Sequence, residues 1–425
     1  MMATGEPYHI ELVADDDLPS FLERRRPAIE AREATGELCR RRFLLNDPRV
    51  GLFHNQRLSY ETAMDVAAAV GRTLVLPGFF KFPHPDAYAG TQWVPVRELF
   101  DMKALRACYP HIVELDDLLR QCGPEVLEEH VAVPFETMWM RSASLAPWIN
   151  GTRPELVWQL PGGGEVLRFK PRETRPEVRI ELEEKMGRLL RAFLADGVAG
   201  ARSVRAHGLI ARNVTVTDSR MCFRPSAAVF QRARTIRAKM ESDAPDPVHV
   251  LGLHVRLFKE STTTSGGYIP AELVDLQQAL CNISPEDFTF LASAVLDRSF
   301  ESFWPTHTFV ASNEANLELM VRYLSGFPGP RRNDYTPAQY DAAVTPEECA
   351  EALRSVLVDA VVCASADYFI GNVCSTMSQY IHLLRLNQGF AMNTSMLLGG
   401  MQHRDLLERT RLIMEERGPR AWVSS

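Results

Sequence analysis

Hydrophobic residues recur with the spacing of strands and helices in two separate parts of the chain. In the first part, a short apolar run at Phe43–Leu45 predicts a buried strand, and a turn containing Gly51 follows. Helical spacing then runs from about Gln56 to Val70, and a second strand, Thr73–Leu76, stops at Pro77-Gly78. A strand–helix–strand unit of this kind is the building block of a parallel α/β sheet.

The same alternation returns in the second half of the chain, after a linker at Asp243–Pro247. An alanine- and arginine-rich helix near Pro225–Met240 ends the first half, and the pattern before it, up to about Leu194, indicates weaker helices and loops. The strands predicted in the second half are Val248–Val255, Phe309–Ala311 and Tyr368–Gly371. The predicted helices are Ala271–Cys281, Ala315–Ser325, Pro346–Ser365 and Ser378–Leu386.

This pattern predicts an α/β protein with two domains around a cleft. We place a polar lead at residues 1–38, an N-terminal domain at 39–242 and a C-terminal domain at 247–425. A length of 425 residues suits two domains with sizeable cores.

Composition and charge limit the kinds of molecule that the protein is expected to bind. The net charge is −7, which argues against a nucleic-acid surface, and we interpret Arg232, Arg234, Arg237 and Lys239 as the solvated face of one helix. No apolar run has the length of a membrane span. The first residues lack the features of a signal peptide, so we expect a cytoplasmic protein, or one in the ER or Golgi lumen if the start is incomplete. The eight cysteines are scattered without a CxxC pair and predict neither a zinc site nor a disulfide framework.

His254 and Arg256 lie at the end of a predicted strand, ahead of a polar, glycine-containing loop. Side chains alternate along a strand, so these two share one face, at the edge where α/β sheets bind ligands. A guanidinium there can hold phosphate oxygens in a bidentate manner. The structural alternative is an arginine paired with an acid and a buried histidine with a backbone partner; we give the two interpretations equal weight.

Ser375 and Thr376 stand where the strand at Tyr368–Gly371 gives way to a helix. One hydroxyl could cap the helix, or hydroxyls and free amides together could bind an anion such as phosphate. Asp367 is expected to brace its strand, whereas Asp359 is either a surface acid or a group that accepts hydrogen bonds from a nucleotide base. Gly51 and Asn55 allow a similar pair of interpretations, a helix cap or a ligand contact.

The sequence lacks several motifs that would indicate a metal site or another class of enzyme. The only Asp-x-Asp is Asp15–Asp17 in the polar lead, so we expect no metal-bound diphosphate and no metal cofactor. His249 and His254 have no companion ligand, and no hydrolase, zinc-protease or Walker motif occurs.

Taken in order, five segments resemble the protein O-fucosyltransferase family. They are "GLFHNQ", "RTLVLPGF", "LGLHVR", "FVASNE" and "VDAVVCASADYFIGNVCST", which span about Arg42 to Arg385. The resemblance implies a GT-B fold, with two Rossmann-like domains facing each other across a cleft. It implies an inverting and metal-independent transfer, with GDP-fucose as donor held mainly by the C-terminal domain and a protein or glycan acceptor on the N-terminal side.

The resemblance also implies roles for individual residues. Arg256 would bind the β-phosphate and the fucosyl oxygen, and Asn55 would face the reacting carbon, which makes these two the candidate catalytic residues. Asp359 would read guanine, and Ser375 and Thr376 would hold the diphosphate. The full set of expected contacts with GDP-fucose is Gly51, Leu52, Phe53, His54, Asn55, His254, Val255, Arg256, Asp359, Ser375 and Thr376, with Asn313, Glu314 and Met377 as further candidates.

The sequence departs from the family at two of these segments. Ser312-Asn313 stands where the family has Thr-Asp, with Glu314 as the candidate replacement, and Leu257-Phe258 follow the His-x-Arg strand. Three hypotheses therefore stand: fucose transfer to a hydroxyl, foremost Ser or Thr of a protein; the same fold with a glycan acceptor or another nucleotide sugar; and a catalytically silent nucleotide-sugar-binding protein.

Overall fold

The computed structural model describes seventeen stretches of the chain. They are residues 38–47, 53–80, 93–128, 130–134, 156–159, 166–169, 173–174, 203–207, 222–242, 248–256, 281, 283–299, 305–312, 317–324, 327, 330–331 and 345–399. Contacts divide the chain into two compact units, residues 1–96 with 102–218, and residues 97–101 with 219–425.

The first unit is built on a six-stranded sheet with the order β5-β2-β1-β10-β6-β9, in which every pairing is parallel. Its strands are β1 Phe43–Asp47, β2 Thr73–Leu76, β5 Ile112–Glu114, β6 His130–Pro134, β9 Glu173–Thr174 and β10 Ser203–His207. Two antiparallel pairs accompany it, β3 Phe79–Phe80 with β4 Trp93–Val94 and β7 Leu156–Gln159 with β8 Val166–Phe169. Its helical elements are η2 Leu38–Arg40, α2 Phe53–Val70, α4 Met102–Cys108, α5 Leu115–Cys122 and α6 Glu125–Glu128, and α3 Val96–Leu99 lies at the boundary along the chain.

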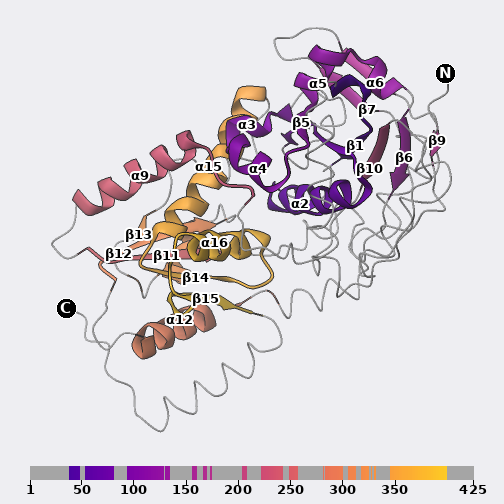
Figure 1. The fold of residues 1–425 in the computed structure, drawn as a ribbon. Coiled ribbons are helices and arrows are strands. Elements are labelled where there is room, and N and C mark those ends of the chain that lie inside the picture. Colours follow the sequence, from indigo (N-terminus) through magenta and orange to yellow (C-terminus); the bar gives the residue numbers. More distant parts are fainter. Residues whose placement is uncertain are drawn as a thin grey trace, which may run out of the picture. The chain divides into compact units, whose positions relative to one another are not determined.

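The second unit is built on a five-stranded parallel sheet with the order β13-β12-β11-β14-β15 (Figure 1). Its strands are β11 Val250–Val255, β12 His307–Ser312, β13 Pro330–Arg331, β14 Tyr368–Asn372 and β15 Ser395–Leu398. Its helical elements are α9 Ala227–Ser242, α12 Pro285–Ser299, α13 Leu317–Leu324, α15 Pro346–Ser365, α16 Thr376–Asn387 and η5 Met392–Thr394. The parallel strands confirm the α/β class predicted from the sequence.

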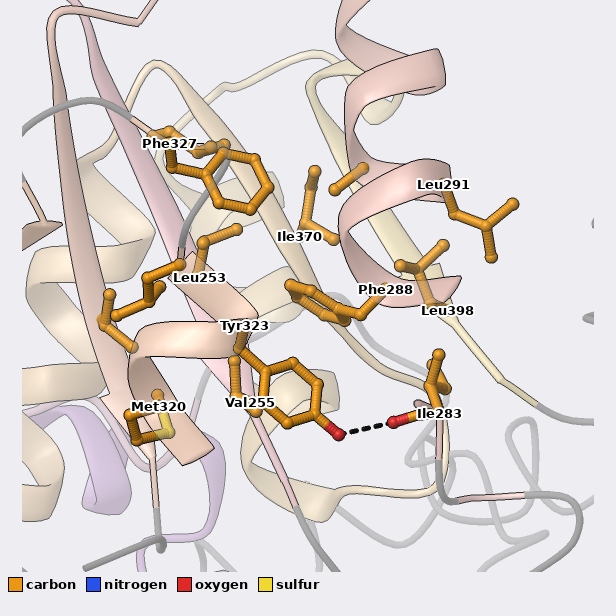
Figure 2. Close-up of a cluster of buried hydrophobic side chains, with 14 of the residues drawn as sticks. Leu253, Val255, Ile283, Phe288, Leu291, Met320, Tyr323, Phe327, Ile370 and Leu398 are labelled. Atoms are coloured by element: carbon orange, nitrogen blue, oxygen red, sulfur yellow. Dashed lines mark hydrogen bonds between the residues drawn. The ribbon is translucent and has the colours of Figure 1, made fainter. Parts of the chain in front are cut away.

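Helices cover both faces of this second sheet. On one face, Leu251, Leu253 and Val255 pack against α12 and α13 in a core that includes Phe288 and Tyr323 (Figure 2). On the other face, Gly252 and Gly371 lack side chains because helices lie directly against them. A Cβ on Gly252 would stand 3.0 Å from the backbone of α15, and a Cβ on Gly371 would stand 2.7 Å from the Ser378 hydroxyl of α16. β11 is therefore buried along its whole length, as its nearly continuous apolar sequence requires.

Local sequence signals account for the best-predicted elements. α15 begins at a capping box, in which Thr345 and Glu348 each bond the other's backbone amide, with proline at the first helical position. Its predicted bounds are confirmed without change, as are those of β2. α2 begins three residues earlier than expected, because Phe53 already packs on Phe79 with ring centroids 4.8 Å apart.

Several expectations were wrong. The middle of the chain contains β5 to β10 rather than only helices and loops, and α12 was not predicted. The predicted helix at 271–281 lies outside the described residues except for Cys281. Disulfides join Cys39 to Cys122 and Cys281 to Cys374, and Cys108 and Cys222 are disulfide-bonded as well, although the scattered cysteines predicted no disulfide framework.

The position of α9 also differs from the sequence prediction, which placed residues up to 242 in the N-terminal domain. Contacts group α9 with the second unit, where it lies along α15 (Figure 1). Arg232 pairs with Glu351 of α15, and Arg237 bonds the Ser365 carbonyl and the Asp367 carboxylate. Only part of the basic run is thus a solvated face, because two of its arginines attach the helix to its neighbour.

Arg385 of α16 has hydrogen bonds to several segments of the second unit. It is fully buried, and its guanidinium donates to carbonyls that end α15 and precede β14, namely those of Ala364, Ala366 and Asp367. It also donates to Thr394 and Ser395, and its guanidinium carbon lies 4.3 Å from the centre of the Phe390 ring. Burial lowers the pKa of Arg385 to about 10, which still leaves the side chain charged at neutral pH.

Replacing Arg385 by methionine should destabilise the protein by about 3–5 kcal/mol, since several buried carbonyls lose their donors at once. Arg322→Met is the matched control, because its partner Glu286 is exposed and an exposed pair contributes little, roughly 0–1 kcal/mol. Denaturant unfolding of both variants measures the difference. Equal stability of the two would show that the Arg385 network does not hold the unit together.

Candidate active site

The strand order of the second sheet reverses between β11 and β14. Numbered along the chain, its strands run third, second, first, fourth and fifth across the sheet, so the first and fourth are neighbours. Connections leave these two strands in opposite directions, which opens a crevice at their carboxyl ends. β11 ends next to Arg256, and β14 ends at Asn372, three residues before Ser375. The candidate residues from both strands therefore meet at the edge where sheets of this type bind ligands.

A small pocket lies at this edge. Leu253 pairs with Ile370, and continuing the register by two residues brings Val255 level with Asn372. The residues that line the pocket are His254, Val255, Arg256, Ile283, Phe288, Tyr323 and Asn372. Figure 2 shows its apolar side, where the Tyr323 hydroxyl donates to the Ile283 carbonyl.

His254 is buried, with 3% of its surface exposed. Its Nδ1 lies 2.6 Å from the hydroxyl of Ser378, so its partner is a side chain and not the backbone group that the structural alternative expected. Burial, followed by the positive charge of Arg256, lowers the pKa of His254 to about 3. The imidazole is therefore neutral near pH 7, and Arg256 carries the positive charge of this pair.

Arg256 lines the pocket and is only partly buried. Arg256 and His254 line the same pocket at the strand end, as alternation predicted. A guanidinium can hold the oxygens of an anionic ligand in a bidentate manner. Arg256 thus lies at the end of the strand, as the sequence predicted, and its role in binding a ligand stays a prediction.

Asn372 organises the turn between β14 and α16 through all of its polar groups. Its side chain donates to the Cys281 carbonyl at 2.6 Å and accepts from the Cys374 amide at 2.9 Å. Its backbone amide donates to the Ser378 hydroxyl at 2.9 Å, and its carbonyl accepts from the Ser375 amide at 3.0 Å. This buried asparagine holds the turn in one shape, with the Cys281–Cys374 disulfide beside it.

The start of α16 does not use the hydroxyl cap that its sequence allowed. Ser375 is the N-cap residue and has extended backbone angles, yet its side chain accepts no hydrogen bond from the first turn. Thr376 and Met377 follow, both partly exposed. Because the first amides of a helix carry partial positive charge, an end without this cap favours the anion-binding interpretation of Ser375 and Thr376.

Asp359 lies on α15, partly buried, one turn before Cys363. Burial and the nearby Asp359 carboxylate raise the pKa of Cys363 well above its usual value, and the Cys363 Sγ lies 3.8 Å from the Leu253 carbonyl. α15 turns directly into β14, so residues earlier in the helix lie closer to the carboxyl edge of the sheet. Asp359 therefore lies about one helical turn nearer that edge than Cys363, the residue beside Leu253. It is on the helix that covers the face of the sheet to which His254 belongs.

In the first unit, the sheet also reverses its strand order, between β1 and β10. Phe53, His54 and Asn55 form the first turn of α2, just after β1. Phe53 and His54 are buried, with 2% and 4% exposed, whereas Asn55 is partly exposed. Asn55 is thus the best placed of the three to contact a ligand, and Phe53 and His54 serve the packing of the unit. Four predicted contacts, Gly51, Leu52, Asn313 and Glu314, lie outside the described residues.

Sequence reasoning missed Asn372, Ser378 and the Cys281–Cys374 disulfide. One signal was present, since Asn372 is a polar residue at the end of an otherwise apolar strand, where a buried amide requires partners. The partners themselves, 91 residues away at Cys281, were not readable from local spacing.

Removal of the disulfide with Cys281→Ser and Cys374→Ser should accelerate amide exchange in residues 373–378 about tenfold or more, because the turn loses its tie to a segment 93 positions away. Hydrogen exchange read by mass spectrometry resolves this segment from α15. The matched control is Cys39→Ser with Cys122→Ser in the first unit, which should leave these amides unchanged. Unaltered exchange in the first double variant would rule out the bracing role.

Comparison with known proteins places the chain among fucosyltransferases. The family model for GDP-fucose protein O-fucosyltransferase matches residues 43–386. POFUT1 in complex with GDP superposes with a TM-score of 0.53 at 16% identity, over 85% of this chain and 99% of that chain. POFUT1 in complex with GDP-fucose gives 0.53 at 16% identity, over 84% and 98%.

A fucosyltransferase NodZ from Bradyrhizobium matches with a TM-score of 0.43 at 15% identity, over 81% of this chain and 92% of that chain, which is too distant to support an argument. Sequence comparison with curated proteins finds no match. The likeness to POFUT1 confirms the GT-B fold class, and the family model covers most of the chain. This protein therefore belongs to the GDP-fucose protein O-fucosyltransferase family and is a fucosyltransferase.

Proposed function

We propose that the protein transfers fucose from GDP-fucose to the hydroxyl of a Ser or Thr in a protein acceptor, with inversion and without a metal ion. The observation that carries this proposal is the meeting of Arg256 and the start of α16 at the point where the second sheet reverses its strand order. Membership in the GDP-fucose protein O-fucosyltransferase family supports GDP-fucose as the donor and a protein as the acceptor.

The chemistry follows from where charge develops. Breaking the bond between fucose and the β-phosphate leaves negative charge on the diphosphate. Arg256 and the amides at Ser375 and Thr376 would stabilise that charge more than the ground state, and this difference lowers the barrier. Fixed positive groups of this kind take the place that a divalent cation has in other nucleotide-sugar enzymes, which supports metal independence.

Two further residues have proposed roles. Asp359 would accept N–H bonds from guanine, which is consistent with its place on α15 one turn nearer the sheet edge than Cys363. Asn55 would position the acceptor or the reacting carbon, since a neutral amide cannot take up a proton near neutral pH. The acceptor proton would then leave through the departing phosphate or water.

The disulfides bear on the compartment. Cys39–Cys122 and Cys281–Cys374 require oxidising conditions to form and persist. We therefore propose that the protein folds in an oxidising compartment such as the secretory pathway, in place of the cytoplasm expected from the sequence. No helix in the described ranges has the length and hydropathy needed to cross a membrane.

The donor can be identified by thermal shift. GDP-fucose and GDP should raise the unfolding temperature, because a ligand that binds only the native state stabilises it by RT ln(1 + [L]/Kd), where [L] is the free ligand concentration. UDP-sugars should give no shift at the same concentration, since Asp359 would meet no guanine N–H groups. A larger shift with a UDP-sugar would contradict the donor assignment.

Arg256→Ala should lower kcat about 100-fold or more, as is typical when one preorganised donor to a developing charge is removed. The assay follows labelled fucose into a protein acceptor in the presence of EDTA, so that persistence of activity also tests metal independence. Arg234→Ala on the exposed side of α9 is the control and should retain full turnover. Near-normal turnover of Arg256→Ala, with its unfolding temperature unchanged, would remove Arg256 from the mechanism. Donor hydrolysis without transfer to any protein would instead favour a glycan acceptor.

A further inference from the structure

The hydrogen bond between His254 and Ser378 joins two segments that are 124 positions apart. The Nδ1 of His254 on β11 lies 2.6 Å from the Ser378 hydroxyl on α16, and Ser378 is fully buried. Ser378 stands one helical turn after Ser375, which begins the helix. The contact therefore ties the histidine of the pocket to the helix start that we assign to the diphosphate.

The direction of this hydrogen bond follows from a third group. The Asn372 amide is an obligatory donor, and it donates to the same Ser378 oxygen at 2.9 Å. The hydroxyl can then donate its single hydrogen to Nδ1 of His254. In this arrangement the Asn372 amide and the Ser378 hydroxyl each donate once. The opposite arrangement, with hydrogen on Nδ1, would make the oxygen accept twice and leave a buried hydroxyl hydrogen in need of another acceptor. The first arrangement places the ring hydrogen on Nε2.

Packing leaves little freedom for this arrangement to change. A Cβ on Gly371 would lie 2.7 Å from the Ser378 oxygen and 2.9 Å from its Cβ, so the serine fills the space that the glycine leaves open. A larger side chain at either position would have to displace β14 or α16. The position suits a residue as small as serine that also carries a hydroxyl.

The charge state of His254 supports the same assignment of the ring hydrogen. Burial and the charge of Arg256 keep His254 neutral over the physiological range, with a pKa of about 3. A neutral imidazole has one N–H, and the nitrogen that carries it decides what the ring can do for a ligand. With Nδ1 occupied by Ser378, the remaining N–H belongs to the nitrogen on the far side of the ring.

We propose that Ser378 is a positioning residue that holds His254 in the Nε2–H tautomer, so that this N–H donates to an acceptor oxygen of the nucleoside diphosphate while Arg256 supplies the charge. The inference rests on the proposed function for the identity of the ligand. The tautomer itself is a property of the ligand-free protein and is open to separate measurement.

The tautomer is read from ¹⁵N chemical shifts of the imidazoles in the ligand-free full chain labelled at histidine. Comparison with His254→Gln identifies the His254 signals by their loss. The wild type should show a protonated Nε2 and an unprotonated Nδ1, and Ser378→Ala should show a mixture of the two tautomers. A protonated Nδ1 in the wild type, or an unchanged tautomer in Ser378→Ala, would overturn the inference whether or not the protein transfers fucose.

Kinetics separate positioning from a purely structural role. Ser378→Ala should raise KM for GDP-fucose about tenfold, the equivalent of one hydrogen bond, with a smaller change in kcat. Ser365→Ala is the matched control, because its hydroxyl bonds only the Val362 carbonyl within α15 in the described structure, and it should change neither constant.

A pair of amide substitutions at His254 tests which imidazole nitrogen contributes to binding of the nucleotide. The amide nitrogen of glutamine reaches the place of Nε2, and that of asparagine reaches the place of Nδ1, so His254→Gln should retain more affinity for GDP than His254→Asn. The reverse order, or an unchanged KM in Ser378→Ala, would contradict the proposal. If GDP fails to bind the wild type while the tautomer is as expected, the proposed function fails and the assignment of the ring hydrogen stands.

Discussion

The parallel pairing of β11 with β14 is the constraint on which the second unit depends, and a polar side chain secures it at each end. At the amino end, the Asp367 carboxylate accepts from the Val250 amide at 2.7 Å, so this acid braces the neighbouring strand rather than its own. At the carboxyl end, Asn372 connects the strand to Cys281, to Cys374 and to α16. Since the strand order reverses between these two strands, fixing their register also fixes the edge where His254 and Arg256 lie.

Arg385 and Arg256, two arginines of this unit, differ in burial and in role. Arg385 lies near the amino end of β14, where backbone carbonyls surround its guanidinium and none of its surface is exposed. Arg256 lies at the carboxyl end, partly exposed and beside a pocket. The first is a structural tie, because its donors already have partners within the protein. Arg256 lies next to His254, which burial and the charge of Arg256 keep neutral, so of these two side chains Arg256 adds the positive charge at that edge, together with the start of α16.

The limits of prediction differ between elements for physical reasons. Long helices with caps, such as α15, and apolar strands, such as β11, could be placed from spacing alone. Strands of two to five residues in the middle of the chain carry too few positions for a period to appear, and β6 and β10 were missed for that reason. The disulfides were missed because each joins cysteines more than 80 positions apart, a distance at which spacing holds no information on proximity. Arg232 and Arg237 looked like a solvated face, since Glu351 and Asp367, which attach them to the rest of the unit, come from other segments.

By itself, the sequence determined the unit of β1, α2 and β2, the positions of β11, β14 and α15, the residues at the ends of β11 and β14, and the likeness to a fucosyltransferase family. These features depend on local periodicity and on motifs that remain legible along the chain. Only the tertiary structure decided which polar residues line the pocket and which hold the turn and the strands together. Ser378 and Asn372 looked like an ordinary helix residue and an ordinary strand end, and their partners became apparent when packing brought together segments 91 and 124 positions apart. A buried hydrogen bond is a relation between two such segments, and no local pattern in either one specifies it.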